Sequence, residues 1–203
     1  MSAHAHARLT VEEYLQLDGS LQTRNEYYAG RMYAMSGGTF DHGVIIGNFS
    51  AQIWIALANR PCRVIPNDLR VRVAADGLYT YPDIVVACGD PIFAPAESVT
   101  LTNPILLAEV LSPSTEAYDR GFKSVQYRQL PSLKEYVIVS QDEPRVEVMQ
   151  RIESGQWRLS EYAGLDAVCH LNSIDCDISL ASVYQKVNFS KAAGDSDHPS
   201  AAE

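Results

Sequence analysis

The fold of this 203-residue chain is decided by two short segments, YPDIVV at residues 81–86 and LLAEVLSPST at residues 106–115. Both read as buried strands, and each carries one carboxylate: Asp83 opens the first apolar run and Glu109 interrupts the second. A carboxylate in a buried strand is costly unless something pairs with it. We therefore expect neighbouring strands whose carboxylates share a partner. A divalent metal is the simplest candidate, because hard cations bind carboxylate oxygens, and the backbone carbonyl of Val110 is a further candidate ligand.

The residues after the second segment predict a helix that is capped by the Ser/Thr-rich turn at 112–115 and ends at Leu130, before Pro131. Asp119, Lys123 and Tyr127 are spaced i, i+4, i+8 and form one stripe on this helix. Taken alone, the stripe is an ordinary solvated face with an ion pair worth about 0.3–0.5 kcal/mol.

Each strand carboxylate also has an ordinary structural interpretation. Asp83 is placed to cap a turn after Pro82, and Glu109 to pair with an arginine. The combination of two strand carboxylates with a lysine on the following helix favours a functional site over these separate explanations.

The remaining pattern predicts a mixed α/β protein. Residues 26–35 read as a hairpin with Ala29-Gly30 at its turn, and a helix capped by Asp41 follows and runs to Leu57. Strands are expected at 63–65, 69–73, 81–88, 105–111, 135–140, 145–152 and 156–162. The helix-linked strands 105–111 and 135–140 should be parallel. We expect one domain over residues 1–189 and a disordered tail over 190–203.

Composition leaves the class of partner open. The net charge is −9, but residues 135–203 hold 5 basic and 12 acidic side chains, whereas residues 60–134 hold 8 of each. The acidity therefore lies mostly away from the expected site and does not exclude a nucleic acid. With no secretion signal or apolar span of about 20 residues, we expect a cytoplasmic protein without a membrane anchor, and four reduced cysteines rather than a disulfide or zinc framework.

The residues quoted so far resemble the bacterial putative restriction endonuclease family of the Uma type, within the PD-(D/E)XK nuclease superfamily. The resemblance covers about residues 8–187. It is carried by Asp83, the EVLSPST string at 109–115, Asp119, Lys123 and Tyr127, and by Glu26, Gly30, Met35, His42, Asn48, Asp68 and residues 132–139.

The resemblance implies a restriction-endonuclease-like α/β core with flanking helices and antiparallel hairpins. It implies Mg²⁺- or Mn²⁺-dependent hydrolysis of DNA, and by analogy a homodimer. Asp83, Glu109 and Val110 would hold the metal, and Asp83, Glu109 and Lys123 would form the catalytic set. Accessory positions are Glu26, His42, Asp68, Asp119 and Tyr127, and the expected phosphate contacts are Arg70 and Arg120.

The chain departs from the superfamily pattern at one position. The signature lysine stands two residues after the strand carboxylate, where this chain has Leu111. The family that it resembles places the lysine on the next helix, here Lys123, from which a long side chain can reach the site. The rival hypothesis is a module on the same fold that binds nucleic acid or regulates without turnover, which the absent strand lysine favours.

Overall fold

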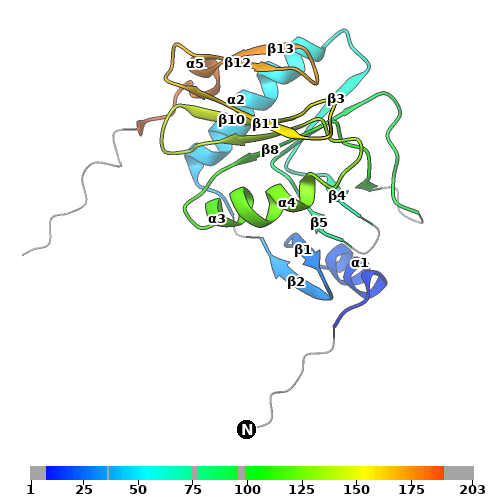
Figure 1. Cartoon of the computed structure of the whole chain (residues 1–203). Helices are drawn as coiled ribbons and strands as arrows, with labels where there is room; N and C mark the ends of the chain where they lie inside the picture. The colour runs from blue at the N-terminus through cyan, green and yellow to red at the C-terminus, as the bar shows by residue number, and fades with distance from the viewer. Residues whose placement is uncertain (1–7, 36, 75–76, 96–98, 190–203) are drawn as a thin grey trace, which may run out of the picture.

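The computed structural model describes residues 8–35, 37–74, 77–95 and 99–189 (Figure 1). The tail predicted over residues 190–203 lies outside the described residues. The architecture is mixed α/β, as predicted, with a six-stranded sheet, a five-stranded sheet and a two-stranded hairpin. None of the helices in the described part of the chain has the length and apolar composition that a membrane span requires.

The six-stranded sheet holds both predicted carboxylate segments. Its order is β11-β10-β9-β8-β6-β3. The bounds are β3 Cys62–Pro66, β6 Ile84–Cys88, β8 Leu106–Val110, β9 Glu135–Val139, β10 Arg145–Arg151 and β11 Trp157–Ala163. The pair β8–β9 is parallel, as predicted, because a helical crossover separates the two strands, and the other pairs are antiparallel.

Two sets of helices cover the two faces of this sheet (Figure 1). Successive side chains along a strand point to opposite faces of the sheet. Ile84 and Ala108 therefore pack against α2, while Val85 and Leu107 pack on the side of Tyr127. The helices are α1 Val11–Ser20, α2 Phe40–Leu57, α3 Glu116–Tyr118, the π-helix η1 Asp119–Lys123, α4 Ser124–Tyr127 and α5 Leu180–Val183. The hairpin β12 Val168–Leu171 and β13 Cys176–Ser179 joins α5 over the α2 face.

The five-stranded sheet, ordered β2-β1-β5-β4-β7, contains the predicted N-terminal hairpin. Its strands are β1 Asn25–Tyr28, β2 Arg31–Ala34, β4 Arg70–Arg72, β5 Tyr79–Thr80 and β7 Thr100–Leu101. Ala29 and Gly30 form the turn with φ of 49° and 83°, the left-handed conformation of a two-residue hairpin loop. One face of the hairpin packs Tyr27 against Tyr14 and Tyr79. The other face is therefore left for the functional site.

Two predicted helices differ in detail. Helix α2 begins two residues earlier than expected, and its cap is Thr39, whose hydroxyl accepts the backbone N–H of His42 at 3.1 Å. Asp41 lies in the first turn instead, where its charge still favours the helix N-terminus. The helix predicted up to Leu130 divides into α3, η1 and α4, with a wide π turn in the middle.

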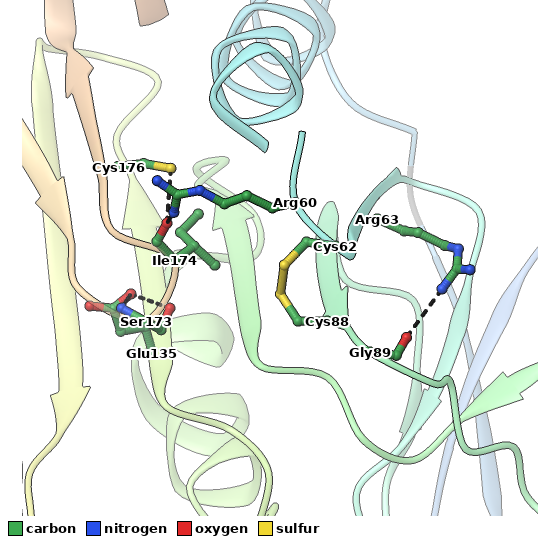
Figure 2. Close-up of a disulfide and its surroundings, with 9 residues drawn as sticks. All are labelled: Arg60, Cys62, Arg63, Cys88, Gly89, Glu135, Ser173, Ile174 and Cys176. Atoms are coloured by element: carbon green, nitrogen blue, oxygen red, sulfur yellow. Dashed lines mark hydrogen bonds between the residues drawn. A yellow bond between two sulfur atoms is a disulfide. The ribbon is translucent and has the colours of Figure 1, made fainter. Parts of the chain in front are cut away.

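The prediction of four reduced cysteines is wrong for two of them. Figure 2 shows a disulfide between Cys62 and Cys88, while Cys169 and Cys176 are buried free thiols. The antiparallel pairing of β3 with β6 sets Cys62 directly opposite Cys88, although 26 positions separate them in sequence. The spacing of cysteines in the sequence does not reveal which residues pair across a sheet, so the disulfide was not predicted.

Candidate active site

The pairing of β6 with β8 brings the two predicted carboxylates together. Ile84 pairs with Ala108, so Asp83, one residue earlier, stands opposite Glu109. Side chains opposite one another in an antiparallel pair share a face. The backbone N–H of Val110 donates to Asp83 Oδ2 at 2.8 Å, and the N–H of Asp83 approaches Glu109 Oε2 at 3.4 Å. Each carboxylate is thus held by the strand that carries the other.

The π turn supplies the lysine. Asp119 begins η1 and Lys123 ends it, and Lys123 Nζ lies 3.1 Å from Asp119 Oδ1 and 3.1 Å from Glu109 Oε1. One turn further, the Tyr127 hydroxyl donates to Glu109 Oε1 at 2.6 Å. The predicted stripe therefore faces the strands and not solvent, because all three of its side chains are buried. π turns inside helices are frequent at functional sites.

The N-terminal hairpin contributes a fourth acid. Glu26 on β1 is 5% exposed, and its Oε1 lies 3.2 Å from Lys123 Nζ. Its carboxylate also accepts the hydroxyls of Thr80 and of Tyr118, the latter at 2.9 Å. Glu26 is therefore part of the same buried network as Glu109.

Sequence reasoning did not single out Thr80 or Tyr118 for this network. Tyr118 stands one position before Asp119, which is the signal that could have drawn attention to it. Thr80 carries no signal of its own, because its contact with Glu26 comes from the pairing of β5 with β1.

Carboxylates outnumber cations in this cluster. Glu109, Asp119 and Glu26 surround one lysine, which is only 5% exposed, and Asp83 stands beside Glu109. Burial raises the pKa of Glu109 and of Asp119 despite the opposing charge of Lys123. Burial by itself would lower the pKa of Lys123, but the surrounding acids outweigh it and the pKa is raised well above the ordinary value. The lysine therefore stays protonated in a region of surplus negative charge.

His42 lies beside Asp83 and Val110. Its Nε2 is 3.0 Å from the carbonyl oxygen of Val110 and 3.4 Å from Asp83 Oδ2. Burial lowers the pKa of His42, yet the hydrogen bond and charge of Asp83 outweigh it, so the pKa is raised overall. The imidazole thus contacts two oxygens that the sequence assigned to a metal.

Three predicted residues are engaged elsewhere. Exposed Asp68 pairs with Arg24. Buried Arg70 contacts Asp18 at 2.8 Å and Thr100 at 2.8 Å. Arg120, predicted with Arg70 to bind phosphate, instead bridges two carboxylates, at 2.7 Å from Glu116 and 2.8 Å from Glu147.

The contacts described above do not bring these three residues to the acid–lysine cluster. The structure gathers Asp83, Glu109, Lys123, Glu26, His42, Asp119 and Tyr127 there.

Comparison with known proteins agrees with this architecture. Residues 11–181 match the model of the family Uma2, described as putative restriction endonuclease. Two uncharacterized proteins of Synechocystis sp. (strain ATCC 27184 / PCC 6803 / Kazusa) are similar. For slr1290 the identity is 34% over 182 residues, covering 90% of this chain and 94% of that protein. For sll1609 it is 33% over 159 residues, covering 78% and 90%.

A solved structure shares the fold. It is the crystal structure of a putative nuclease belonging to DUF820 from Anabaena variabilis ATCC 29413, with a TM-score of 0.71 and 20% sequence identity. The match covers 87% of this chain and 97% of that one. At this identity the likeness concerns the fold, which confirms the expected nuclease-like α/β core. The family match is independent of it and spans most of the chain, so this protein belongs to the Uma2 family of putative restriction endonucleases.

Proposed function

We propose that this protein is a metal-dependent DNA endonuclease whose reaction centre is the acid–lysine cluster. One observation carries the proposal. Asp83 and Glu109 stand opposite each other on neighbouring strands, and the buried ammonium of Lys123 lies 3.1 Å from Glu109. Glu109 and Lys123 are buried and Asp83 is partly buried, which is costly for charged groups from three separate segments, and structural pairing alone would need only one acid for one lysine.

The donor set fits a magnesium-type ion better than a fully protein-bound metal. Among the described residues, no group of three or more His, Cys, Asp or Glu side chains has the arrangement of a metal cage. Mg²⁺ typically takes one or two carboxylates and completes its shell with water and substrate phosphate. Asp83 and Glu109 would be those carboxylates, with the carbonyl of Val110 beside them. When bound, Mg²⁺ or Mn²⁺ polarises a phosphoryl oxygen and makes bound water more acidic.

The protein's own groups would orient the reaction. A water adds to phosphorus and the P–O3′ bond breaks, which leaves a 5′-phosphate and a 3′-hydroxyl. One proton leaves the water and one is taken up by the 3′-oxygen, so the step balances. The Lys123 ammonium donates hydrogen bonds to the water and to phosphate oxygens, where negative charge grows. Because the pKa of Lys123 is raised, it acts as a cation and not as the proton acceptor.

Tyr127 and Tyr118 act as positioning residues. Their hydroxyls donate to Glu109 and Glu26, two of the acids that contact the lysine. Removing either hydroxyl should displace the ammonium without removing a reacting group.

The rival function is a nucleic-acid-binding or regulatory module without turnover. Two contacts favour it: Lys123 is already paired with three carboxylates, and His42 already touches Asp83 and the Val110 carbonyl. In that case the cluster is complete without a metal or a substrate.

A plasmid-nicking assay with Mg²⁺ or Mn²⁺ distinguishes the endonuclease from the module without turnover. We expect nicking by the wild type that is lost in Lys123→Met and in Asp83→Asn and kept in the matched control Lys186→Met, whose side chain is exposed. Calorimetric titration with Mn²⁺ should show binding that Asp83→Asn abolishes. An absence of metal-dependent nicking of any DNA form, with Mn²⁺ binding unchanged in Asp83→Asn, would refute the endonuclease.

The homodimer expected by analogy stays a prediction. Sedimentation equilibrium of the purified chain, with and without DNA, tests it.

A further inference from the structure

A cavity lies beside the acid–lysine cluster, and the reaction proposed above assigns it no role. It has a volume of about 570 Å³, within the ~300–1,000 Å³ of ordinary ligand pockets. The β1–β2 hairpin forms one wall and residues 114–123 form the other. Four aromatic side chains line it: Tyr28, Tyr33, Tyr118 and Phe122.

The aromatic rings are held in an ordered arrangement. Tyr118 and Phe122 stack nearly parallel, with centroids 5.3 Å apart and an interplanar angle of 14°. Tyr28 meets Phe122 edge-on at 4.7 Å and 75°. Tyr33 is 46% exposed, and it shares a face with Glu26 because the two are cross-strand partners. A planar ring entering the cavity would meet aromatic side chains on both walls, with Met35 beside them.

The cavity is continuous with the candidate active site. Two of its lining residues, Glu26 and Lys123, belong to the acid–lysine cluster. Lys123 Nζ lies 5.5 Å from the centroid of the Tyr118 ring, so the ammonium borders both the cavity and Glu109. A molecule whose phosphate lies at Lys123 would present its adjoining group to the aromatic wall.

We propose that this cavity receives one unpaired nucleobase of the DNA strand that is cut, next to the scissile phosphate. The inference rests on the proposed function and specifies its substrate: single-stranded DNA, or a site where a base has left the duplex. Bases of any type stack on aromatic side chains, whereas a base inside an intact duplex must first be unstacked to reach such a pocket. A concave pocket lined by aromatic side chains therefore favours unpaired over paired substrate.

The test measures binding of a single-stranded oligonucleotide that carries 2-aminopurine, whose fluorescence is quenched when it stacks. Binding is measured in EDTA, so that it does not depend on metal or turnover. The variants are Tyr33→Ala, Tyr33→Phe and the control Trp54→Ala, an exposed aromatic on α2 that does not line the cavity. Tyr33 is chosen because it is 46% exposed on a hairpin, more than the partly buried rings of Tyr28, Tyr118 and Phe122 that line the rest of the cavity.

We expect Tyr33→Ala to weaken binding by about 5- to 150-fold, the equivalent of about 1–3 kcal/mol for one stacked base, and to reduce quenching. Tyr33→Phe should restore both, and Trp54→Ala should change neither. An intact duplex of the same sequence should bind more weakly than the single strand, and a mismatch at one position should recover part of the difference. Wild-type affinity and quenching in Tyr33→Ala would overturn the inference.

A second arm locates the base. Oligonucleotides with one abasic site at successive positions should lose affinity at one position only, and Tyr33→Ala should abolish that dependence. Equal affinity for every abasic position would contradict a strand-bound base. A free deoxynucleoside monophosphate that competes for the protein as well as the oligonucleotide does would contradict it too. Position-dependent binding without nicking in Mg²⁺ or Mn²⁺ would refute the endonuclease and leave the base pocket standing.

Discussion

Replacing Lys123 with methionine should be the most damaging single change in the cluster. Methionine matches the length of the lysine stem, so packing is largely kept while the ammonium is lost. Lys123 Nζ lies 3.1–3.2 Å from carboxylate oxygens of Glu109, Asp119 and Glu26, and the residue is 5% exposed. Removing one partner of a buried ion pair costs about 3–5 kcal/mol, because charge is left uncompensated. With an m-value of about 2 kcal/mol/M, the urea midpoint should fall by about 2 M.

The stability that Lys123→Met loses should depend on pH. Because burial raises the folded-state pKa of Glu109 above its unfolded value, folding favours its protonated form, and stability from this group falls as pH rises through the folded pKa. Without the opposing charge of Lys123 the folded pKa rises further. The destabilisation should therefore be small at pH 5, where the carboxyls take up protons on folding, and largest near pH 8. Urea unfolding followed by circular dichroism at both pH values measures it.

Two controls separate charge from packing. The exposed Lys186→Met should leave the midpoint unchanged at both pH values. The double change Lys123→Met with Asp119→Asn should regain part of the loss, because one surplus charge is gone. A single-variant loss below about 1 kcal/mol at pH 8, or one that does not vary with pH, would refute the argument that Lys123 neutralises buried carboxylates.

Three further outcomes follow from local contacts. Tyr127→Phe deletes the 2.6 Å donor to Glu109 and should cost about 1.5–3 kcal/mol in urea unfolding, whereas a loss under 0.5 kcal/mol would show that water replaces the phenol. Thr10→Ala breaks the capping box with Glu13 and should lower the free energy of unfolding by about 1 kcal/mol, which calorimetry would detect as a lower melting temperature. An unchanged melting temperature would mean that α1 contributes nothing to global stability. Burial raises the pKa of the Cys169 thiol to about 12, so iodoacetamide at pH 8 should label it only in urea, and rapid labelling of the native protein would contradict its burial.

The core of the site could be predicted because it follows from strand patterning. Asp83 and Glu109 interrupt apolar runs, and the cost of burying them already indicates that the two strands meet. The parallel pairing of β8 with β9 followed from the helix between them. These inferences needed only local periodicity and the rule that a crossover joins parallel strands.

Other parts of the site depend on contacts between segments that local sequence does not describe. Glu26 was expected near the site only through the family resemblance, and its partners Thr80 and Tyr118 come from the neighbouring strand β5 and from helix α3. The π turn is hidden for another reason, since Asp119 and Lys123 have the same i, i+4 spacing in either helix type. The disulfide was missed because register, and not spacing, pairs Cys62 with Cys88.

The scattered origin of the cluster has a consequence for biosynthesis. Its acids come from residues 26, 83, 109 and 119, and its only lysine is residue 123. Strand β8, which carries Glu109, is completed on one side by β9, whose last residue is Val139. Translation must therefore pass Val139 before the cluster can assemble on a completed β8–β9 pair. Products of interrupted translation that end before Val139 would lack the completed sheet around the cluster, so, under the function proposed above, such partial copies would have no nuclease activity.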